Sequence, residues 1–183
     1  MINGIIGIYL MNEVYIFDID GCIMPPIISN FDKTAKPREK MVNEAKNIGR
    51  KIKLFSTFIN YYEKYCKHAN SVFFITGRKH SEFGKLTESK LNLLKKLKAF
   101  QIIYYPESKL HESQEYFEWK TKIVQKIIRR SITDKIYGNN IIFHIFDDMN
   151  DYFPSLKELS EQNGLEVNLS LIKGEKSWKK LGV

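Results

Sequence analysis

The stretch VYIFDIDG, residues 14–21, is a short apolar run that ends in two aspartates and a glycine. An apolar run of this length predicts a buried strand that leads into a polar loop. Asp18 and Asp20 stand two residues apart, so in extended geometry both carboxylates point the same way. Gly21 allows the chain to turn sharply directly after them. The stretch therefore predicts a strand end that presents paired carboxylates.

Further apolar runs along the chain predict strands of the same kind. They cover residues 72–75, 102–105, 141–146 and 167–172. Between the runs, apolar residues recur at the spacing of amphipathic helices. These helical stretches run from Pro37 to about His68, where Gly49 suits a division into two helices, and over residues 86–98, 115–130 and 156–162. Residues 21–36 are expected to form a loop, which leaves room for a short flap.

Strands that alternate with helices, each a continuous apolar run, predict an α/β fold with a Rossmann-like parallel sheet and helices on both faces. Ligands bind such sheets at the carboxyl ends of the strands. Polar residues follow three of the predicted strands at that end, namely Asp18 and Asp20, Thr76 and Arg78, and Asp147 and Asp148. We therefore expect these side chains to converge on one site.

The composition fits a folded protein with an anionic partner. The chain has 183 residues, 43% of them hydrophobic, which suits a single domain over residues 1–183 with a sizeable core. Its 29 Lys and Arg residues exceed its 21 Asp and Glu residues, giving a net charge of +8. This surplus favours nucleic acid, acidic lipid or a phosphorylated molecule as partner, although a lysine-rich solvated surface gives the same total.

The cysteines and the N-terminal residues indicate the cellular setting. Cys22 and Cys66 lie far apart without metal-ligand spacing, which favours a reducing environment. Residues 1–10 are apolar but have neither the basic start nor the cleavage pattern of a leader peptide, and they are too few to span a bilayer. We therefore expect a cytoplasmic protein without a membrane partner. The sequence leaves its oligomeric state open.

The acidic residues at the predicted strand ends suggest a metal. Asp18, Asp20, Asp147 and Asp148 would crowd one pocket, and such crowding is costly unless a cation is present. Hard oxygen ligands in an incomplete cage, with room left for water and phosphate, suit Mg²⁺. The residues themselves therefore predict a magnesium site that can also admit a phosphate group.

These motifs together resemble those of the haloacid dehalogenase (HAD) superfamily of phosphatases, from about Val14 to Leu171. The first motif is YIFDIDG at residues 15–21, and the second, a Thr or Ser after a strand, is FITGR at residues 74–78. The third, a Lys on a later helix, is best matched by Lys120, with Lys122 as the alternative. The fourth, an acidic pair after a strand, is IFDDMND at residues 145–151.

The resemblance implies a role for each motif residue. Asp18 would attack phosphorus, and Asp20 would protonate the leaving oxygen and then activate water. Thr76 and Lys120 would stabilise the transferring phosphoryl group, with Gly77 and Arg78 binding the substrate. Asp18 and the backbone carbonyl of Asp20 would hold Mg²⁺ together with residues of the fourth motif. The register of that motif leaves open whether Asp147, Asp148 or Asp151 binds the metal directly.

The order of the motifs is similar to that in the branch of polynucleotide-repair and Swiss army knife RNA-repair-like phosphatases, although Met149 stands where that branch usually has Arg. The resemblance implies a phosphorylated polynucleotide end as substrate and a core with little or no cap. Two alternatives stay open: a small-molecule or nucleotide monophosphatase, and a catalytically silent nucleic-acid-binding module. The choices between RNA and DNA and between 3′ and 5′ ends also stay open.

Overall fold

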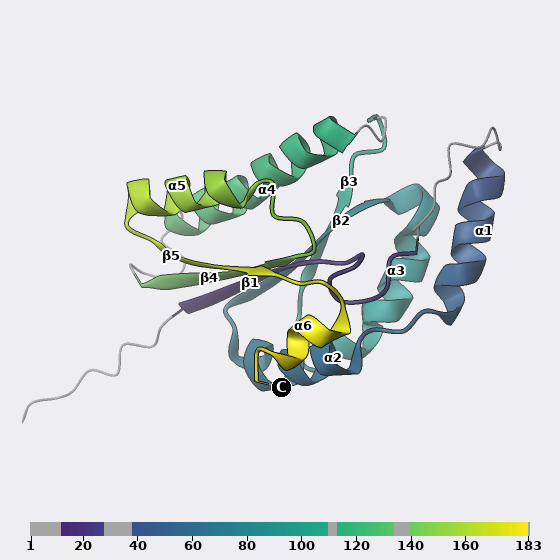
Figure 1. The fold of residues 1–183 in the computed structure, drawn as a ribbon, viewed down its shortest axis with the longest axis horizontal. Helices are drawn as coiled ribbons and strands as arrows, with labels where there is room; N and C mark the ends of the chain where they lie inside the picture. The colour runs from purple at the N-terminus through teal and green to yellow at the C-terminus, as the bar shows by residue number, and fades with distance from the viewer. Residues whose placement is uncertain (1–11, 28–37, 110–112, 134–139, 183) are drawn as a thin grey trace, which may run out of the picture.

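A five-stranded sheet forms the centre of the molecule in the computed structural model, which describes residues 12–27, 38–109, 113–133 and 140–182 (Figure 1). The strands are β1 (Asn12–Asp18), β2 (Ser71–Lys79), β3 (Gln101–Tyr105), β4 (Ile141–Asp147) and β5 (Glu166–Leu171). They lie in the order β3-β2-β1-β4-β5, and each neighbouring pair is parallel. The predicted α/β fold with a Rossmann-like parallel sheet is therefore confirmed.

Helices cover both faces of this sheet (Figure 1). They are α1 (Arg38–Lys51), α2 (Ser56–Tyr65), the short 3₁₀ helix η1 (Cys66–His68), α3 (His80–Lys95), α4 (Ser113–Thr133), α5 (Phe153–Asn163) and α6 (Glu175–Lys179). One face carries α4 and α5, and the opposite face carries α2, α3 and α6, with α1 packed on the outside of α3. No helix within the described ranges is long and apolar enough to cross a membrane.

The central strand β1 supplies both layers of the core. Val14 and Ile16 are buried against α4 and α5, whereas Tyr15 and Phe17 are buried against α2 and α6. Successive side chains of a strand point to opposite faces, so a strand covered on both sides has to be apolar throughout. This requirement explains the continuous apolar run that ends at Asp18.

Gly49 was expected to divide residues 37–68 into two helices, but it lies inside α1. The break between α1 and α2 falls at residues 52–55. A Cβ atom on Gly49 would lie 2.7 Å from Leu86 and 3.0 Å from Ile27. The glycine therefore allows α1 to approach α3 closely. In the sequence alone, a glycine required for packing cannot be told from a glycine that ends a helix.

Two helices differ from the sequence expectation. α3 begins at His80, six residues before the predicted start, because β2 continues through the second motif to Lys79 and the helix follows directly. α6 was not predicted. Its Trp178 is fully buried, and the indole N–H donates a hydrogen bond to the backbone carbonyl of Cys22 over 2.8 Å. The C-terminal segment is thereby fixed beneath the loop that follows β1.

The strand order reverses at β1. The chain passes from β1 to β2 and β3 on one side and then crosses back to β4 and β5 on the other. Such a reversal opens a crevice outside the carboxyl ends of the strands on either side of it. Asp18 ends β1 and Asp147 ends β4, so the acidic motifs meet at this crevice.

Candidate active site

The floor of the crevice is the carboxyl end of β1. Asp18 is only 5% exposed there, and the chain turns directly beyond it, with Gly21 at a φ of +78°. A Cβ atom on Gly21 would collide with the carboxylate of Asp148, so the glycine also makes room for a close approach between the first and fourth motifs. Gly21 therefore has two structural reasons to be a glycine.

Lys120 reaches this floor from the side of the sheet that α4 covers. It is 2% exposed, and its Nζ lies 2.6 Å from Oδ1 of Asp18 and 2.5 Å from Oδ2 of Asp147. Lys122, two residues further along α4, is exposed and lies 3.9 Å from Glu118 instead. A helix turns by about 200° over two residues, so only one of the two lysines can face the sheet. The structure brings Lys120 into the site and leaves Lys122 outside it.

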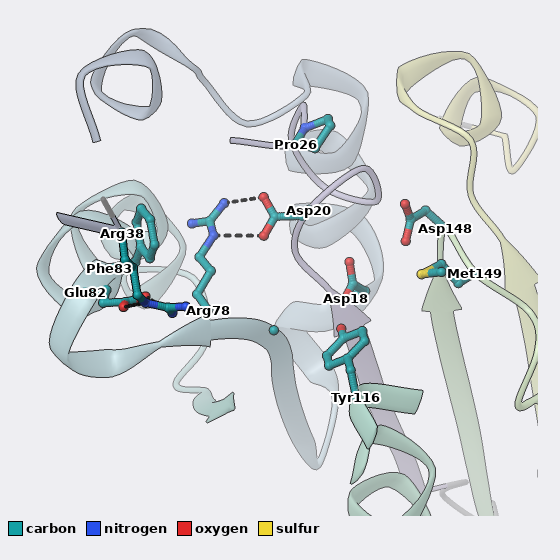
Figure 2. A pocket seen from close by; sticks show the side chains of 11 residues that line it. Asp18, Asp20, Pro26, Arg38, Arg78, Glu82, Phe83, Tyr116, Asp148 and Met149 are labelled. Carbon is teal, nitrogen blue, oxygen red and sulfur yellow. Dashed lines mark hydrogen bonds and ion pairs between the residues drawn. The ribbon is translucent and has the colours of Figure 1, made fainter. Parts of the chain in front are cut away.

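The fourth motif places its two aspartates in different surroundings. Asp147 is fully buried and accepts hydrogen bonds from the Tyr152 hydroxyl over 2.5 Å and from the backbone N–H of Met149 over 3.0 Å. Asp148 is half-buried and faces the cavity above Asp18 (Figure 2). The Lys173 ammonium group donates to the backbone carbonyl of Asp148 over 2.5 Å. Asp147 is thus fixed by the protein, while Asp148 is open to a ligand.

The charges at the floor do not balance. Burial raises the pKa of Asp18 well above its ordinary value; Lys120 opposes this shift, and the carboxylates of Asp147 and Asp148 add to it. Burial and the neighbouring Asp147 carboxylate also raise the pKa of Asp148, to about 6. Burial alone would lower the pKa of Lys120, but the surrounding acidic groups raise it well above its usual value. The pocket therefore favours a further positive charge.

A magnesium ion fits this excess of negative charge. One carboxylate oxygen from each of Asp18, Asp147 and Asp148 lies within 4.8 Å of the other two. Carboxylate oxygens are the ligands that Mg²⁺ prefers. Asp151 is exposed and lies outside this group. The carboxylate of Asp20 is paired with Arg78, so the predicted metal ligand from Asp20 is its backbone carbonyl.

Asp20 and Arg78 lie side by side in the wall of the cavity (Figure 2). The guanidinium donates from Nε to Oδ2 over 2.9 Å and from Nη2 to Oδ1 over 2.6 Å. Arg78 is 3% exposed, and its Nη1 donates to the Thr87 hydroxyl on α3 over 3.0 Å. The backbone N–H of Ile27 donates to Asp20 over 3.1 Å as well. Arg78, from the second motif, therefore orients the carboxylate of Asp20.

The other residues of the second motif lie at the same edge. Thr76 is fully buried at the carboxyl end of β2, and its hydroxyl oxygen accepts a hydrogen bond from the backbone N–H of Arg78 over 3.2 Å. An oxygen that accepts this bond can still donate its own proton to a ligand. Gly77 lines the cavity with its backbone. Thr76 follows Ile75, the β2 residue that pairs with Asp18, but it is not among the residues that line the cavity.

The cavity over these groups has a volume of about 540 Å³. Asp18, Asp20 and Asp148 form its acidic side (Figure 2). Its other walls are largely apolar and come from Pro26, Phe83, Tyr116 and Met149. The ion pair between Arg38 and Glu82, 2.7 Å long, lines the rim. The flap predicted over residues 22–36 lies partly outside the described residues, which include only its first part to Ile27.

The sequence analysis missed several residues of the site, among them Tyr116, Tyr152 and Lys173, which lie close to Lys120, Asp147 and Asp148. Tyr116 lies one helical turn before Lys120, so it follows from the lysine once that residue is placed. Lys173 stands just past the end of β5, where the argument from strand ends also applies. No sequence pattern points to Tyr152.

Comparison with solved structures finds a domain of similar fold. The HAD domain of the effector protein Lem4 from Legionella pneumophila, solved as an inactive mutant, aligns with a TM-score of 0.51 at 16% identity, covering 93% of this chain and 91% of that one. A chain of the Pnkp1/Rnl/Hen1 RNA repair complex aligns with a TM-score of 0.46 at 12% identity, covering 87% of this chain. This protein spans 42% of the length of that chain.

Sequence comparisons add nothing to this result. No protein-family model matches the sequence. No curated protein matches it either. The likeness to the Lem4 HAD domain, at 16% identity, shows a shared fold, and the fold expected from the resemblance is thereby confirmed.

Proposed function

We propose that this protein is a Mg²⁺-dependent phosphatase that forms an aspartyl-phosphate on Asp18. The observation that carries the proposal is the position of the Asp18 carboxylate. It lies at the floor of a cavity, in contact with the Lys120 ammonium group and within 4.8 Å of Asp147 and Asp148. A nucleophile that attacks a phosphate dianion needs such positive charge and such a metal site beside it.

The proposed reaction has two steps, formation of the aspartyl-phosphate and its hydrolysis. A carboxylate oxygen of Asp18 attacks phosphorus, the bond from phosphorus to the leaving oxygen breaks, and Asp20 gives its proton to that oxygen. Asp20 then takes a proton from water, whose oxygen attacks the aspartyl-phosphate and releases inorganic phosphate and the free carboxylate. Asp20 lines the same cavity as Asp18, which is the placement that both proton transfers require.

The remaining groups stabilise charge during both steps. Lys120 offsets the negative charge that Asp18 shares with the phosphoryl group, and Thr76 donates a hydrogen bond to a phosphoryl oxygen. Asp18, Asp147 and Asp148 would hold Mg²⁺, which neutralises the charge of the phosphate when bound. Arg78 keeps Asp20 in place and presents a second cation at the cavity wall.

Hydrolysis of p-nitrophenyl phosphate tests the chemistry. We expect turnover with Mg²⁺, loss of turnover in EDTA, and a loss of at least about a thousandfold in Asp18→Asn. The matched control is Glu158→Gln, which replaces an exposed carboxylate and should keep full activity. Thermal unfolding of each variant separates loss of chemistry from loss of fold. Activity that survives in folded Asp18→Asn would refute the mechanism.

The substrate that we propose is a phosphorylated polynucleotide end. Support comes from the net charge of +8 and from the segments that follow the first two motifs. Their described parts form β3, the helices α2 and α3 on the sheet and α1 on the outside of α3, with no separate cap. A site without a cap admits large substrates. A small-molecule or nucleotide monophosphatase is the second candidate, because a cavity of about 540 Å³ with apolar walls is within the size range of small-molecule sites.

A comparison of substrates separates the two candidates. The rate of phosphate release from a 3′-phosphorylated oligonucleotide is compared with the rates from a 5′-phosphorylated oligonucleotide and from nucleoside monophosphates. Each rate is measured at low and high salt. A polynucleotide phosphatase should prefer an oligonucleotide and lose that preference as salt rises. Equal rates without a salt effect would favour the monophosphatase.

A further inference from the structure

A second concave surface lies on α4, away from the catalytic cavity. It is a groove of about 390 Å³ lined by Lys122, Gln125, Lys126, Arg129, Arg130 and Thr133, which we call the α4 groove. None of these residues lines the cavity above Asp18. Lys120 faces the sheet, whereas the charged members of the groove are exposed. The mechanism proposed above makes no use of this surface.

The charge of the α4 groove is uncompensated. From Thr121 to Thr133 the helix contains no acidic residue. Lys122 has a loose contact with Glu118 at 3.9 Å, and within the described ranges no ion pair is formed by Lys126, Arg129 or Arg130. Like charges three or four residues apart destabilise a helix by a few tenths of a kcal/mol per pair. The dipole at the helix end favours Arg130 but does not reach Lys122.

The dimensions of the groove match a strand of nucleic acid. Eleven residues separate Lys122 from Thr133, and an α-helix rises about 16 Å over that distance. The cationic side chains of the groove are spread over this length, which is long enough to reach more than one phosphate of a strand. Four cationic side chains along the groove can therefore contact successive phosphates of one strand.

The surroundings of the groove favour nucleic acid over a membrane. Helices that bind acidic lipid insert apolar side chains next to their basic residues. The large apolar residues that are exposed in the described part of the chain are Ile48, Leu93 and Leu171, and they lie on α1, α3 and β5. The exposed face of α4 between Lys122 and Thr133 is polar.

We propose that the α4 groove binds the phosphate backbone of a nucleic-acid strand, without base specificity and apart from the reacting phosphate. This inference deepens the proposed function by naming a part of the substrate that is held away from Asp18. Binding to the backbone would raise the local concentration of polynucleotide ends around the catalytic cavity. It would also give a role to the four basic side chains that α4 carries between Thr121 and Thr133 without an acidic residue among them.

The test measures binding without catalysis. A fluorescent 12-nucleotide RNA and a DNA of the same sequence, both with hydroxyl ends, are titrated with the full chain at 50 and 200 mM NaCl. Four phosphate contacts predict an affinity that falls about fiftyfold between these salt concentrations. The triple variant Lys126→Gln, Arg129→Gln, Arg130→Gln should bind more weakly, and the magnitude of its salt slope should fall by about 2.

The matched control removes the same charge from the opposite face of the sheet. It is Lys67→Gln, Lys179→Gln, Lys180→Gln, all exposed residues, and it should bind more tightly than the groove variant and keep the wild-type salt slope. Equal binding by the two triple variants would overturn the proposal, as would absence of wild-type binding. Groove-dependent binding to phosphatidylserine vesicles but not to either oligonucleotide would also overturn it and assign the surface to lipid.

Two further measurements keep the test conclusive. Thermal unfolding shows whether the groove variant folds, and Lys126→Gln alone serves as a milder variant with a smaller expected change in slope, about 0.7. Hydrolysis of p-nitrophenyl phosphate needs no groove, so the groove variant should keep its wild-type rate. Loss of oligonucleotide binding with this rate retained would leave the proposed chemistry intact, whereas an inactive wild type that still binds would refute the chemistry alone.

Discussion

Arg78 holds the carboxylate of Asp20 in a two-pronged ion pair, with N–O distances of 2.9 Å and 2.6 Å. The arginine is buried and is itself fixed by the hydroxyl of Thr87, while about a third of the Asp20 side chain stays exposed to the cavity. The two residues are 58 positions apart in the sequence. This pairing orients the proposed general acid and base while leaving it within reach of a substrate.

Replacing Arg78 with Lys should therefore impair catalysis more than stability. A lysine keeps the charge but cannot form the two parallel hydrogen bonds. We expect kcat for p-nitrophenyl phosphate to fall about tenfold, and kcat for an alkyl phosphate about a hundredfold, because a poor leaving group depends more on protonation. Arg50→Lys, on the exposed side of α1, is the control and should change neither rate. Equal losses for both substrates would contradict a role in orienting Asp20.

Replacing Lys120 with Met should destabilise the protein. The variant leaves the buried carboxylates of Asp18 and Asp147 without their cation, and the loss of one partner of a buried ion pair costs about 3–5 kcal/mol. The free energy of unfolding from urea titration at pH 7.5 measures this loss. Lys122→Met, an exposed change on the same helix, should cost less than about 0.5 kcal/mol. A similar small loss in both variants would show that the buried pair contributes little.

Magnesium should stabilise the wild-type protein through the three-carboxylate site. A ligand at a hundred times its dissociation constant adds about 2.7 kcal/mol to the free energy of unfolding. Asp148→Asn should remove most of this gain because it loses one of the three oxygen ligands. Asp151→Asn should keep the gain, since Asp151 is exposed and lies outside the group. A larger loss in Asp151→Asn would move the metal site towards that residue.

His144 should make stability depend on pH. Burial lowers the pKa of His144, with the nearby Glu13 opposing the shift. The unfolded chain therefore binds a proton at a higher pH, near 6.5, than the folded protein does. Stability from this group is present above that pH and is lost as the pH falls towards the folded pKa, at up to about 1.4 kcal/mol per pH unit.

His144→Phe tests this dependence, because it keeps a ring against Tyr15, whose ring centroid lies 4.5 Å from that of His144. The difference in unfolding free energy between wild type and variant, measured from pH 5 to 8, should shrink or reverse as the pH falls. His68→Asn, an exposed control, should show no such trend. A pH-independent difference for His144→Phe would show that this histidine does not titrate on unfolding.

The elements of the fold could be read from the sequence wherever a strand is buried on both faces. Residues 14–17 of β1 and 141–146 of β4 form apolar runs, interrupted by His144, because helices cover both sides of the sheet, and this pattern needs no knowledge of the neighbours. The helices were harder to delimit. Gly49 suggests a break in the helix as long as the close approach of Leu86 is not known. The start of α3 at His80 depends on β2 continuing beyond Thr76.

The sequence by itself determined that several acidic residues and one threonine follow strands of a parallel sheet, and that such strand ends share one edge. Tertiary structure decided which side chains touch. It selected Lys120 over Lys122 through the rotation of α4, paired Asp20 with Arg78, and placed Asp151 outside the acidic group. The spacing of apolar residues along the sequence shows whether a segment is a strand or a helix. The direction of a side chain towards a partner depends on how those elements pack, and that depends on the whole chain.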